Sequence, residues 1–253
     1  MKDLAAMSIL ITGGSSGIGA GAARYFAQRG ARVTISARRE DRLNEVRRQI
    51  GERAHAVVGD VTVDADRKRM IDEAVAHGAG LDALINNAGN MYRGEITELE
   101  EQPLLDIFNS NVVSGMLLSG LATPELARRN GAIIFLGSIH TRRAFPGASP
   151  YAATKGALEA LTGVMAAELG EKGIRVNCVV PGAVPTEMYQ RAGLLSDEDA
   201  RARIEGMATM HPLGRIGTEE EIAEAMAYLI QAEWTTGAVL VVDGGLGLGS
   251  TSA

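Results

Sequence analysis

Short apolar, β-branched runs alternate with longer segments of helical spacing along the whole chain of 253 residues. Runs that are apolar on both faces predict strands buried in a parallel sheet, with helices covering both sides. The alternation therefore predicts one α/β domain over residues 1–253, with a doubly wound sheet that binds its ligands at the carboxyl ends of the strands. Strands are expected at residues 8–12, 32–36, 55–59, 83–86, 132–137, 174–180 and 238–243.

The segments between these strands predict the helices and a long insertion. Helical spacing covers residues 18–30, 39–50, 64–78, 98–129, 151–173 and 218–231. Residues 181–217 are irregular and contain several prolines and glycines, and an insertion of this length in a compact domain is often a substrate lid. We expect the lid at about residues 186–217, with a helix over 196–210 that Ser196 caps.

Charge and hydropathy exclude some classes of partner. The formal net charge of −6 argues against nucleic acid and anionic membranes. The apolar run at the N-terminus is too short to span a bilayer, and no later run reads as long and charge-free enough. We therefore expect a cytoplasmic protein with no membrane segment. The single cysteine, Cys178, excludes an intrachain disulfide, and we expect no metal site.

A glycine-rich turn follows the first expected strand. Residues 12–19 read TGGSSGIG, and glycines at this spacing allow a tight turn whose amides and following helix can face a pyrophosphate. A merely flexible turn is the alternative, but the position between a strand and a helix favours nucleotide binding. The candidate cofactor residues here are Gly13, Ser15, Ser16, Gly17, Ile18 and Gly19.

The end of the second expected strand bears on the choice of cofactor. Ala37 stands where an NAD-binding protein would carry an acid for the ribose hydroxyls, and Arg38 and Arg39 follow it. A guanidinium there could pair with the 2′-phosphate of NADP, whereas a carboxylate would repel that phosphate. Solvated charges at the start of a helix are the alternative. The sequence favours NADP(H), with NAD(H) possible.

Two more turns follow expected strands. Asp60, with Val61 in GDVT, could hydrogen-bond the adenine amino group or could cap the next helix, and the sequence does not separate these roles. The turn NNAG at residues 86–89 holds Asn87, Ala88 and Gly89, whose small size lets the backbone approach a ribose or nicotinamide. Taken alone, NNAG would be read only as a turn.

Further features complete a pattern: Asn111, Ser138, the segment YAATK at residues 151–155 and the segment VVPGAVPTEM at residues 179–188. Along essentially the whole chain this pattern resembles the short-chain dehydrogenase/reductase family, in its branch of glucose, carbonyl and 3-oxoacyl reductases. The resemblance implies a seven-stranded Rossmann-type sheet of order 3-2-1-4-5-6-7, a nicotinamide dinucleotide and a homotetramer. The catalytic group it implies is Asn111, Ser138, Tyr151 and Lys155, and the cofactor contacts it adds are Pro181, Gly182, Val184 and Thr186.

The chemistry explains why Tyr151 and Lys155 are four residues apart. Adding a hydride to a carbonyl carbon requires a proton for its oxygen, and a phenol supplies one if its pKa is brought toward neutrality. The ammonium of Lys155, one helical turn away on the same face, would stabilise the phenolate and would also bind the nicotinamide ribose. Ser138 would hydrogen-bond the substrate oxygen. By resemblance, Asn111 distorts its helix and holds a water that joins Lys155 to solvent.

The substrate pocket is expected in the loops above the strand ends. Its candidate residues are His140, Met91, Tyr92, Met188 and Tyr189, with a packing role as the alternative for each. The mainly apolar set favours a small-molecule ketone with a hydrophobic body.

The predicted function is interconversion of a carbonyl and a secondary alcohol with NADP(H). One alternative is reduction of 3-oxoacyl groups on acyl carrier protein, with Arg128, Arg129 and Lys172 at helix ends as candidate carrier contacts; cations that favour helix C-termini are their other interpretation. A second alternative is a sensor or scaffold that binds NADP(H) without chemistry, although such proteins commonly lose the Tyr or the Lys.

Overall fold

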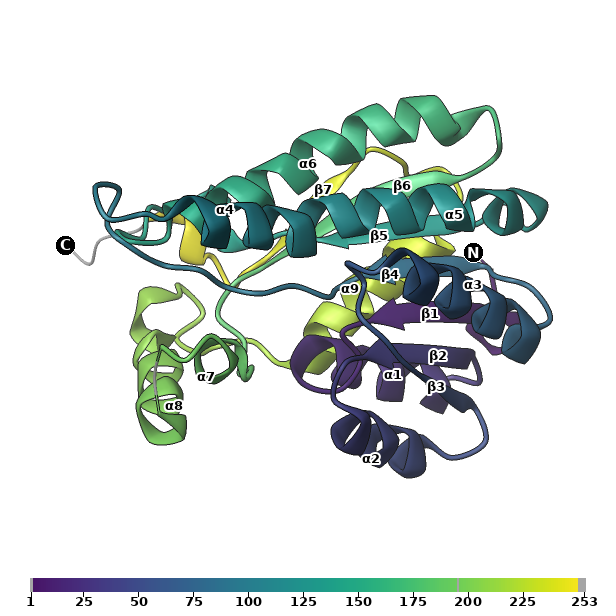
Figure 1. Ribbon diagram of the computed structural model, residues 1–253, viewed down its shortest axis with the longest axis horizontal. Coiled ribbons are helices and arrows are strands. Elements are labelled where there is room, and N and C mark those ends of the chain that lie inside the picture. The colour runs from purple at the N-terminus through teal and green to yellow at the C-terminus, as the bar shows by residue number, and fades with distance from the viewer. Residues whose placement is uncertain (1, 195, 250–253) are drawn as a thin grey trace.

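The computed structural model describes residues 2–194 and 196–249, without the side chains of residues 189 and 191. Its centre is a seven-stranded sheet of order β3-β2-β1-β4-β5-β6-β7 in which every neighbouring pair is parallel, as predicted (Figure 1). The strands are β1 (Ser8–Thr12), β2 (Arg32–Ala37), β3 (Ala54–Val58), β4 (Ala83–Asn86), β5 (Ala132–Leu136), β6 (Arg175–Pro181) and β7 (Val239–Val242).

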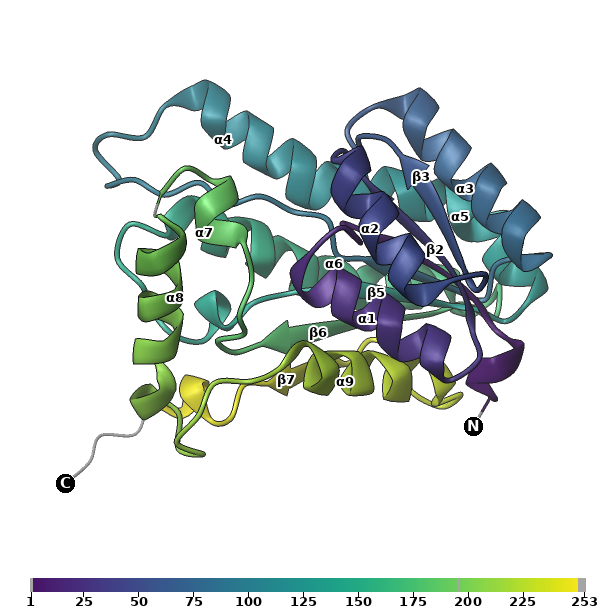
Figure 2. The same ribbon diagram turned by 90° about the horizontal axis from the view of Figure 1, so that it is seen from below.

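Helices cover both faces of the sheet (Figure 2). On one face lie α1 (Gly17–Gln28), α2 (Glu40–Ile50) and α9 (Glu219–Gln231), and on the other α3 (Asp64–Gly78), α4 (Glu101–Phe108), α5 (Ser114–Arg128) and α6 (Ser149–Gly170). Successive strand side chains alternate between the two layers: Ile9 and Ile11 pack with Phe26 of α1, whereas Leu10 packs with Leu118 of α5. The strands are therefore buried on both sides, which fixes their register.

The order of the strands decides where a ligand can enter. The chain winds outward from β1 to β3 and then returns to place β4 on the other side of β1. The loops that follow β1 and β4 therefore diverge, and they leave a crevice at the carboxyl edge of the sheet.

Short 3-10 turns lie at Leu4–Ala6 (η1), Ile139–Thr141 (η3) and Leu246–Leu248 (η5).

The single helix expected at residues 98–129 is interrupted. A π-helical turn, η2 (Asn109–Val113), separates α4 from α5. The side chain of Asn111 explains the interruption, because its Oδ1 accepts the amide of Asn90 at 2.7 Å and its Nδ2 donates to the Asn90 carbonyl at 2.9 Å. A π-helical turn holds one residue more than the same turn of an α-helix, and this extra residue places Asn111 beside the backbone of Asn90.

The expectation that no segment has the length and hydropathy of a membrane span was too strong. Within residues 2–194 and 196–249, the helix Glu101–Arg128 reaches a mean hydropathy of 1.3 over 18 residues. Part of it is covered by protein, however: 44% of that window is buried, and α5 packs on α3 and the sheet. The helix covers a sheet face as a core helix does.

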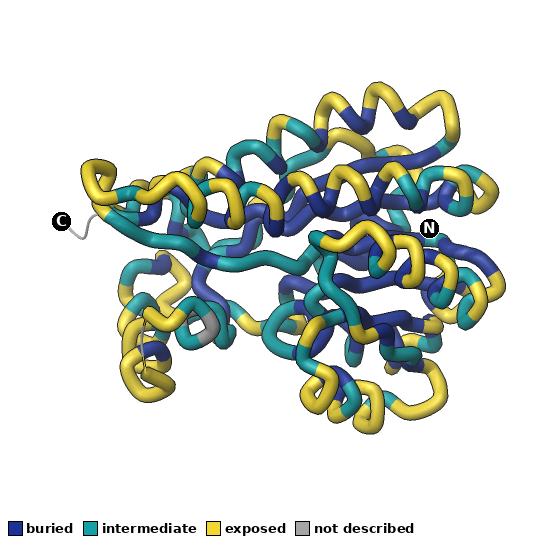
Figure 3. The backbone as a smooth tube through the Cα atoms, viewed as in Figure 1, coloured by how far each residue is buried: buried dark blue, intermediate teal, exposed yellow. Residues whose placement is uncertain are grey.

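The segment predicted to be a lid, which is called the lid below, contains α7 (Met188–Arg191), α8 (Asp197–Gly206) and the 3-10 turn η4 (Ala208–Met210). The one helix expected over residues 196–210 is thus divided at Met207. Ser196 caps α8 as predicted, because its hydroxyl accepts the amide of Asp199 at 3.1 Å. The lid lies beyond the carboxyl edge of the sheet, and its outer surface is exposed (Figures 1 and 3).

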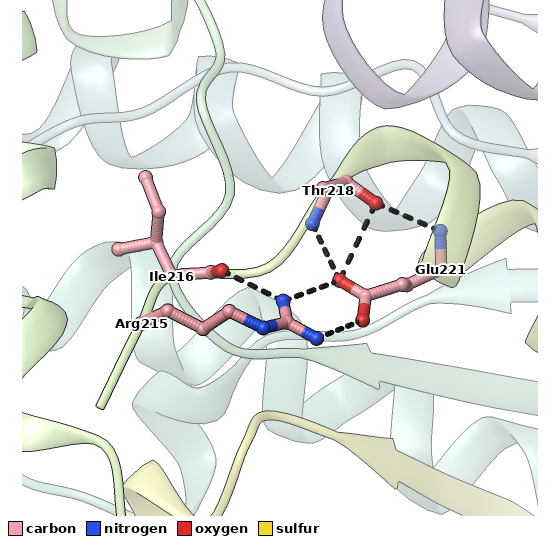
Figure 4. Close-up of polar contacts among 4 residues, drawn as sticks. All are labelled: Arg215, Ile216, Thr218 and Glu221. Atoms are coloured by element: carbon pink, nitrogen blue, oxygen red, sulfur yellow. Dashed lines mark hydrogen bonds and ion pairs between the residues drawn. The ribbon is translucent and has the colours of Figure 1, made fainter. Parts of the chain in front are cut away.

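A clamp of polar contacts fixes the chain where it leaves the lid (Figure 4). Glu221 and Thr218 form a capping box at the start of α9: the Glu221 carboxylate accepts the Thr218 amide at 2.9 Å, and the Thr218 hydroxyl accepts the Glu221 amide at 3.2 Å. Both oxygens of that carboxylate also accept hydrogen bonds from the guanidinium of Arg215, at 2.5 and 3.0 Å. The bonds from Arg215 are the largest of the effects that lower the pKa of Glu221 to about 2.

Candidate active site

The loops after β1 and β4 are joined by hydrogen bonds. The hydroxyl of Thr12, at the end of β1, accepts the amides of Asn87 at 3.1 Å and Ala88 at 3.0 Å. The Asn87 side-chain amide donates to the Thr12 carbonyl at 2.8 Å. These bonds hold the NNAG turn against the glycine-rich turn, so the two loops are fixed in position relative to each other. Thr12 was not singled out in the sequence, although its place as the last strand residue before the turn was a usable signal.

The glycine-rich turn fits a dinucleotide pyrophosphate. Gly13 and Gly17 have φ values of +70° and +54°, which only glycine adopts without strain. A Cβ on Gly19 would stand 2.4 Å from the Gly13 carbonyl oxygen, so the turn could not close this tightly around any side chain. Ser16 precedes α1 but forms no side-chain cap, which leaves the amides of the first turn of that helix available to an anion.

A groove beside this turn has the size and position for the adenosine end of the cofactor. Its empty volume is about 1450 Å³ when the open solvent at its mouth is included. The predicted residues Ser15, Arg38, Arg39, Asp60, Val61, Ala88 and Gly89 line it, together with Ala37. Asp60 does not cap α3; its carboxylate accepts the amide of Thr62 at 2.9 Å and lies 3.6 Å from the guanidinium of Arg38. Capping is therefore wrong as a role for Asp60.

Helix α6 brings Tyr151 and Lys155 to the neighbouring cleft. Pro150 stands in the first turn of the helix, where its missing N–H is not needed, and the next residue is Tyr151. Tyr151 and Lys155 are both only 4% exposed, and the Lys155 Nζ lies 5.5 Å from the centre of the Tyr151 ring. Nζ donates to the Leu136 carbonyl at 2.7 Å, at the end of β5. The strand thus holds the ammonium beside the phenol.

Burial changes the acidity of Lys155. Removal from water lowers the pKa of its ammonium to about 8, and an electrostatic interaction with nearby Cys178 partly opposes this shift. Burial in turn raises the pKa of the Cys178 thiol to about 12, so this cysteine is a packed apolar group, as the sequence predicted, and not a nucleophile. The proton on Lys155 is therefore more labile than that of an ordinary surface lysine.

Asn111 reaches the catalytic helix through Thr154. The Asn111 Nδ2 donates to the Thr154 hydroxyl at 3.1 Å, and that hydroxyl donates to the Tyr151 carbonyl at 2.8 Å. Thr154 is fully buried. The distortion of the helix at Asn111 agrees with the prediction, while the direct partners of the side chain are Asn90 and Thr154. Sequence reasoning missed Thr154, which stands in YAATK between Tyr151 and Lys155.

Ser138 and His140 are in contact at the end of β5. The Ser138 Oγ lies 3.0 Å from the His140 Nδ1, and the His140 ring meets the Tyr151 ring edge-on at 5.1 Å. Burial, followed by the charges of Arg93 and Lys155, lowers the pKa of His140 to about 4, so the imidazole is neutral near pH 7. If Nδ1 carries the proton, it donates to Ser138 and leaves the serine hydroxyl proton for a substrate oxygen. In that case the buried Nε2, which has no hydrogen-bond partner, is an unprotonated acceptor. Leaving a buried acceptor unpaired costs less free energy than leaving a buried N–H unpaired.

The cleft lined by Tyr151 and Lys155, called the catalytic cleft below, has an empty volume of about 990 Å³ when the open solvent at its mouth is included. Many predicted residues line it: Gly13, Ser16, Gly17, Ile18, Asn87, Ala88, Gly89, Met91, Ser138, His140, Tyr151, Lys155, Pro181, Gly182, Val184, Thr186 and Met188. Tyr92 does not border the cleft directly: its hydroxyl accepts the Glu100 amide at 3.1 Å, and the residue packs against the cluster that contains Met91 and Tyr151, so a pocket role for it stays a prediction. The side chain of Tyr189 lies outside the described part of the structure. Ile204 and Glu187 of the lid also line the cleft, and the sequence did not indicate them.

The cations considered for a carrier protein do not border this cleft. Arg128 ends α5 and Lys172 follows α6, and both helices end where the chain enters the amino-terminal edge of the sheet. Arg128 forms an ion pair with Glu125, and the guanidinium of Arg129 donates to the Ala79 carbonyl. Within one chain, these side chains lie at the opposite edge from the catalytic group.

Known proteins are similar to this chain in sequence. The family described as enoyl-(acyl carrier protein) reductase matches residues 13–247. A 3-oxoacyl-[acyl-carrier-protein] reductase of Chlamydia muridarum is 34% identical over 244 residues, which cover 94% of this chain and 96% of the relative. An L-fucose dehydrogenase of Oryctolagus cuniculus is 35% identical over 246 residues, which cover 96% of this chain and 85% of the relative.

Comparison with a solved structure confirms the fold. A short-chain dehydrogenase/reductase of unknown function from Caenorhabditis elegans, with cofactor, superposes with a TM-score of 0.91 at 29% identity, over 98% of this chain and 97% of the other. Fold and site together define an oxidoreductase that uses a nicotinamide cofactor and acts on CH–OH groups. The chain belongs to the short-chain dehydrogenase/reductase family.

Proposed function

We propose that the protein interconverts a ketone and a secondary alcohol with NADP(H), and that Tyr151 is its general acid and base. The observation that carries this proposal is that Tyr151, Lys155 and Ser138 line the same cleft as the glycine-rich turn at Gly13 and Gly17. When bound, the cofactor supplies a hydride to the carbonyl carbon or takes one from the carbinol carbon.

The side chains divide the remaining work. Negative charge grows on the carbonyl oxygen during reduction, and Tyr151 donates its phenolic proton to that oxygen. The ammonium of Lys155 stabilises the phenolate left behind. Ser138 donates a hydrogen bond to the same oxygen, since a proton on the His140 Nδ1 leaves the serine hydroxyl free to do so. In the alcohol direction the phenolate takes the proton back.

The preference for NADP(H) rests on the end of β2. Ala37 presents no carboxylate to a 2′-phosphate, while Arg38 and Arg39 line the adenosine groove. Arg38 is the more available of the two, because 63% of its side chain is exposed and its contact with Asp60 is a loose 3.6 Å. A guanidinium in this position attracts a phosphate dianion more strongly than a ribose hydroxyl.

A homotetramer working in the cytoplasm on a small-molecule substrate is also part of this proposal. Support for association comes from apolar side chains exposed on the long helices: Leu105 on α4, Met116 and Leu117 on α5 and Val164 on α6, each 45–57% exposed. Association would bury these side chains. Light scattering that gave the monomer mass at micromolar concentration would contradict the tetramer.

The lining of the cleft favours a ketone with an apolar body, since Met91, Met188, Ile204 and Met207 surround the catalytic group. The relatives do not agree on a substrate, because their names refer to 3-oxoacyl groups and to L-fucose. The positions of Arg128, Arg129 and Lys172 do not support docking of an acyl carrier protein at the mouth of the same chain.

The test is a panel of ketones and secondary alcohols, including a 3-oxoacyl thioester with and without its carrier, assayed with NADPH, NADH and their oxidised forms. We expect turnover with NADPH, and a loss of about 10³-fold in Tyr151→Phe with unchanged NADPH binding. Full activity of Tyr151→Phe would overturn the mechanism. Binding of NADPH without oxidation across the whole panel would favour a sensor or scaffold.

A further inference from the structure

An ion pair joins the adenosine groove to the lid. Arg39 stands between β2 and α2, and Glu187 directly precedes α7, 148 residues further along the chain. The Arg39 Nη2 donates to a Glu187 carboxylate oxygen at 2.9 Å and to the Ser16 hydroxyl at 3.0 Å. Arg39 lines the adenosine groove, whereas Ser16 and Glu187 line the catalytic cleft. One guanidinium therefore bridges the two cavities.

Glu187 is ionised in this arrangement. Burial by itself would raise the pKa of its carboxyl, but the hydrogen bond and charge of Arg39, with smaller contributions from Arg42 and Ser16, outweigh burial and hold the pKa below its usual value. Its charge also contributes, after burial, to the raised pKa of Glu219, which is itself paired with Arg24 at 3.1 Å. The groups facing Arg39 thus include a full negative charge.

We propose that Glu187 reduces the preference for 2′-phosphorylated nucleotides by competing with their 2′-phosphate for Arg39. This proposal rests on the proposed use of NADP(H). A phosphate in the adenosine groove meets a guanidinium whose charge is partly neutralised by the carboxylate. A ribose without a 2′-phosphate does not bind Arg39 through a phosphate, so Glu187 does not compete with it. Glu187 therefore lowers affinity for 2′-phosphorylated nucleotides and leaves affinity for the others unchanged.

The same competition affects the lid. Glu187 immediately precedes the first turn of α7, and Thr186 before it packs near Gly17 of the cofactor turn, at 3.1 Å from where a Cβ of Gly17 would lie. A phosphate that draws Arg39 toward the groove weakens a bond between the lid and the rest of the protein. Binding at the adenosine end is thereby coupled to the segment that covers the substrate.

Calorimetric binding of 2′,5′-ADP and 5′-AMP to the full chain tests this without turnover. We expect Glu187→Gln to bind 2′,5′-ADP about five-fold more tightly, and 5′-AMP as the wild type does. Glu205→Gln, which removes the same charge from the exposed lid helix α8, is the matched control and should change neither affinity. In an Arg39→Ala background, Glu187→Gln should have no effect on either nucleotide.

A second readout follows hydrogen exchange in α7, which 2′,5′-ADP should accelerate in the wild type and 5′-AMP should not. An unchanged or weakened affinity of Glu187→Gln for 2′,5′-ADP overturns the proposal, and so does an effect that persists without Arg39. These outcomes are separate from failure of the proposed function, because nucleotide binding is measured whether or not any carbonyl is reduced.

Discussion

Helix α6 and the lid face the same cleft but are held by different kinds of interaction. On α6 the polar groups are buried and bound to backbone carbonyls, as in the bonds of Lys155 to Leu136 and of Thr154 to Tyr151. On the lid, α8 has one buried residue, Ala200, and most of its surface is exposed (Figure 3). Under the proposed function, the reacting groups lie where burial fixes their geometry, and the residues that select the substrate lie where few contacts hold the chain.

Replacing Lys155 by Met should give the largest effect on activity, because it removes the buried positive charge that α6 places beside Tyr151. We expect kcat to fall about 10²- to 10³-fold, since the phenolate loses its stabilising cation. Lys172→Met, at an exposed position two residues after the same helix ends, is the control and should retain full activity. A Lys155→Met enzyme within two-fold of the wild type would show that burial at this position serves packing alone.

The same residue gives a pH dependence with a definite sign. Burial lowers the pKa of Lys155 to about 8 in the folded protein, while the unfolded chain keeps its proton to about 10.5. Between these values the unfolded state binds more protons, so the contribution of this group to stability rises with pH and is lowest below pH 8. Chemical denaturation of the wild type and of Lys155→Met across pH 7.5–10.5 should show this rise only in the wild type.

Asn111→Ala should have an intermediate effect, since it acts on α6 through Thr154. The variant loses the bonds to Asn90 and Thr154, and a small displacement of Tyr151 is expected to reduce kcat by about 10- to 100-fold. The midpoint temperature of thermal unfolding should also fall, because the Asn90 amide and carbonyl lose buried partners. Val113→Ala, on the exposed side of the same π-helical turn, should change neither quantity. If kcat stayed unchanged while stability fell, Asn111 would be a purely structural residue.

The smallest effect is expected at the clamp beyond the lid. Glu221→Gln removes the charge that binds Arg215 and weakens the capping box, at a cost of about 1 kcal/mol in a partly exposed position. Because the pKa of Glu221 is lowered to about 2, this contribution is present above about pH 4.5 and is lost as the pH falls toward 2. Denaturant titration at pH 6 and pH 3, with Glu220→Gln as control, measures it. A large loss of kcat instead would show that the lid controls the chemistry.

Much of the fold could be predicted from the sequence because strand and helix patterns differ in period. The strand order, the catalytic positions and the glycine turn needed the resemblance or the motif in addition. The break at Asn111 could not be placed from the pattern, since an asparagine in a helical run does not reveal that Asn90 lies beside it in space. The hydrogen bond from the Glu100 amide to the Tyr92 hydroxyl was hidden from the sequence for the same reason, because only the folded loop brings the two groups together.

The π-helical turn at residues 109–113 also has a consequence for helical phase. One inserted residue rotates everything before it by about 100° relative to everything after it, because an α-helix has 3.6 residues per turn. Ile107 of α4 packs with Tyr151, while Leu118 of α5 packs under the sheet, and a regular helix could not present both residues to these partners. A deletion in this turn would make the helix more regular and would turn α4 away from the active site. Here, local irregularity is what keeps two faces of one helix in register with two different neighbours.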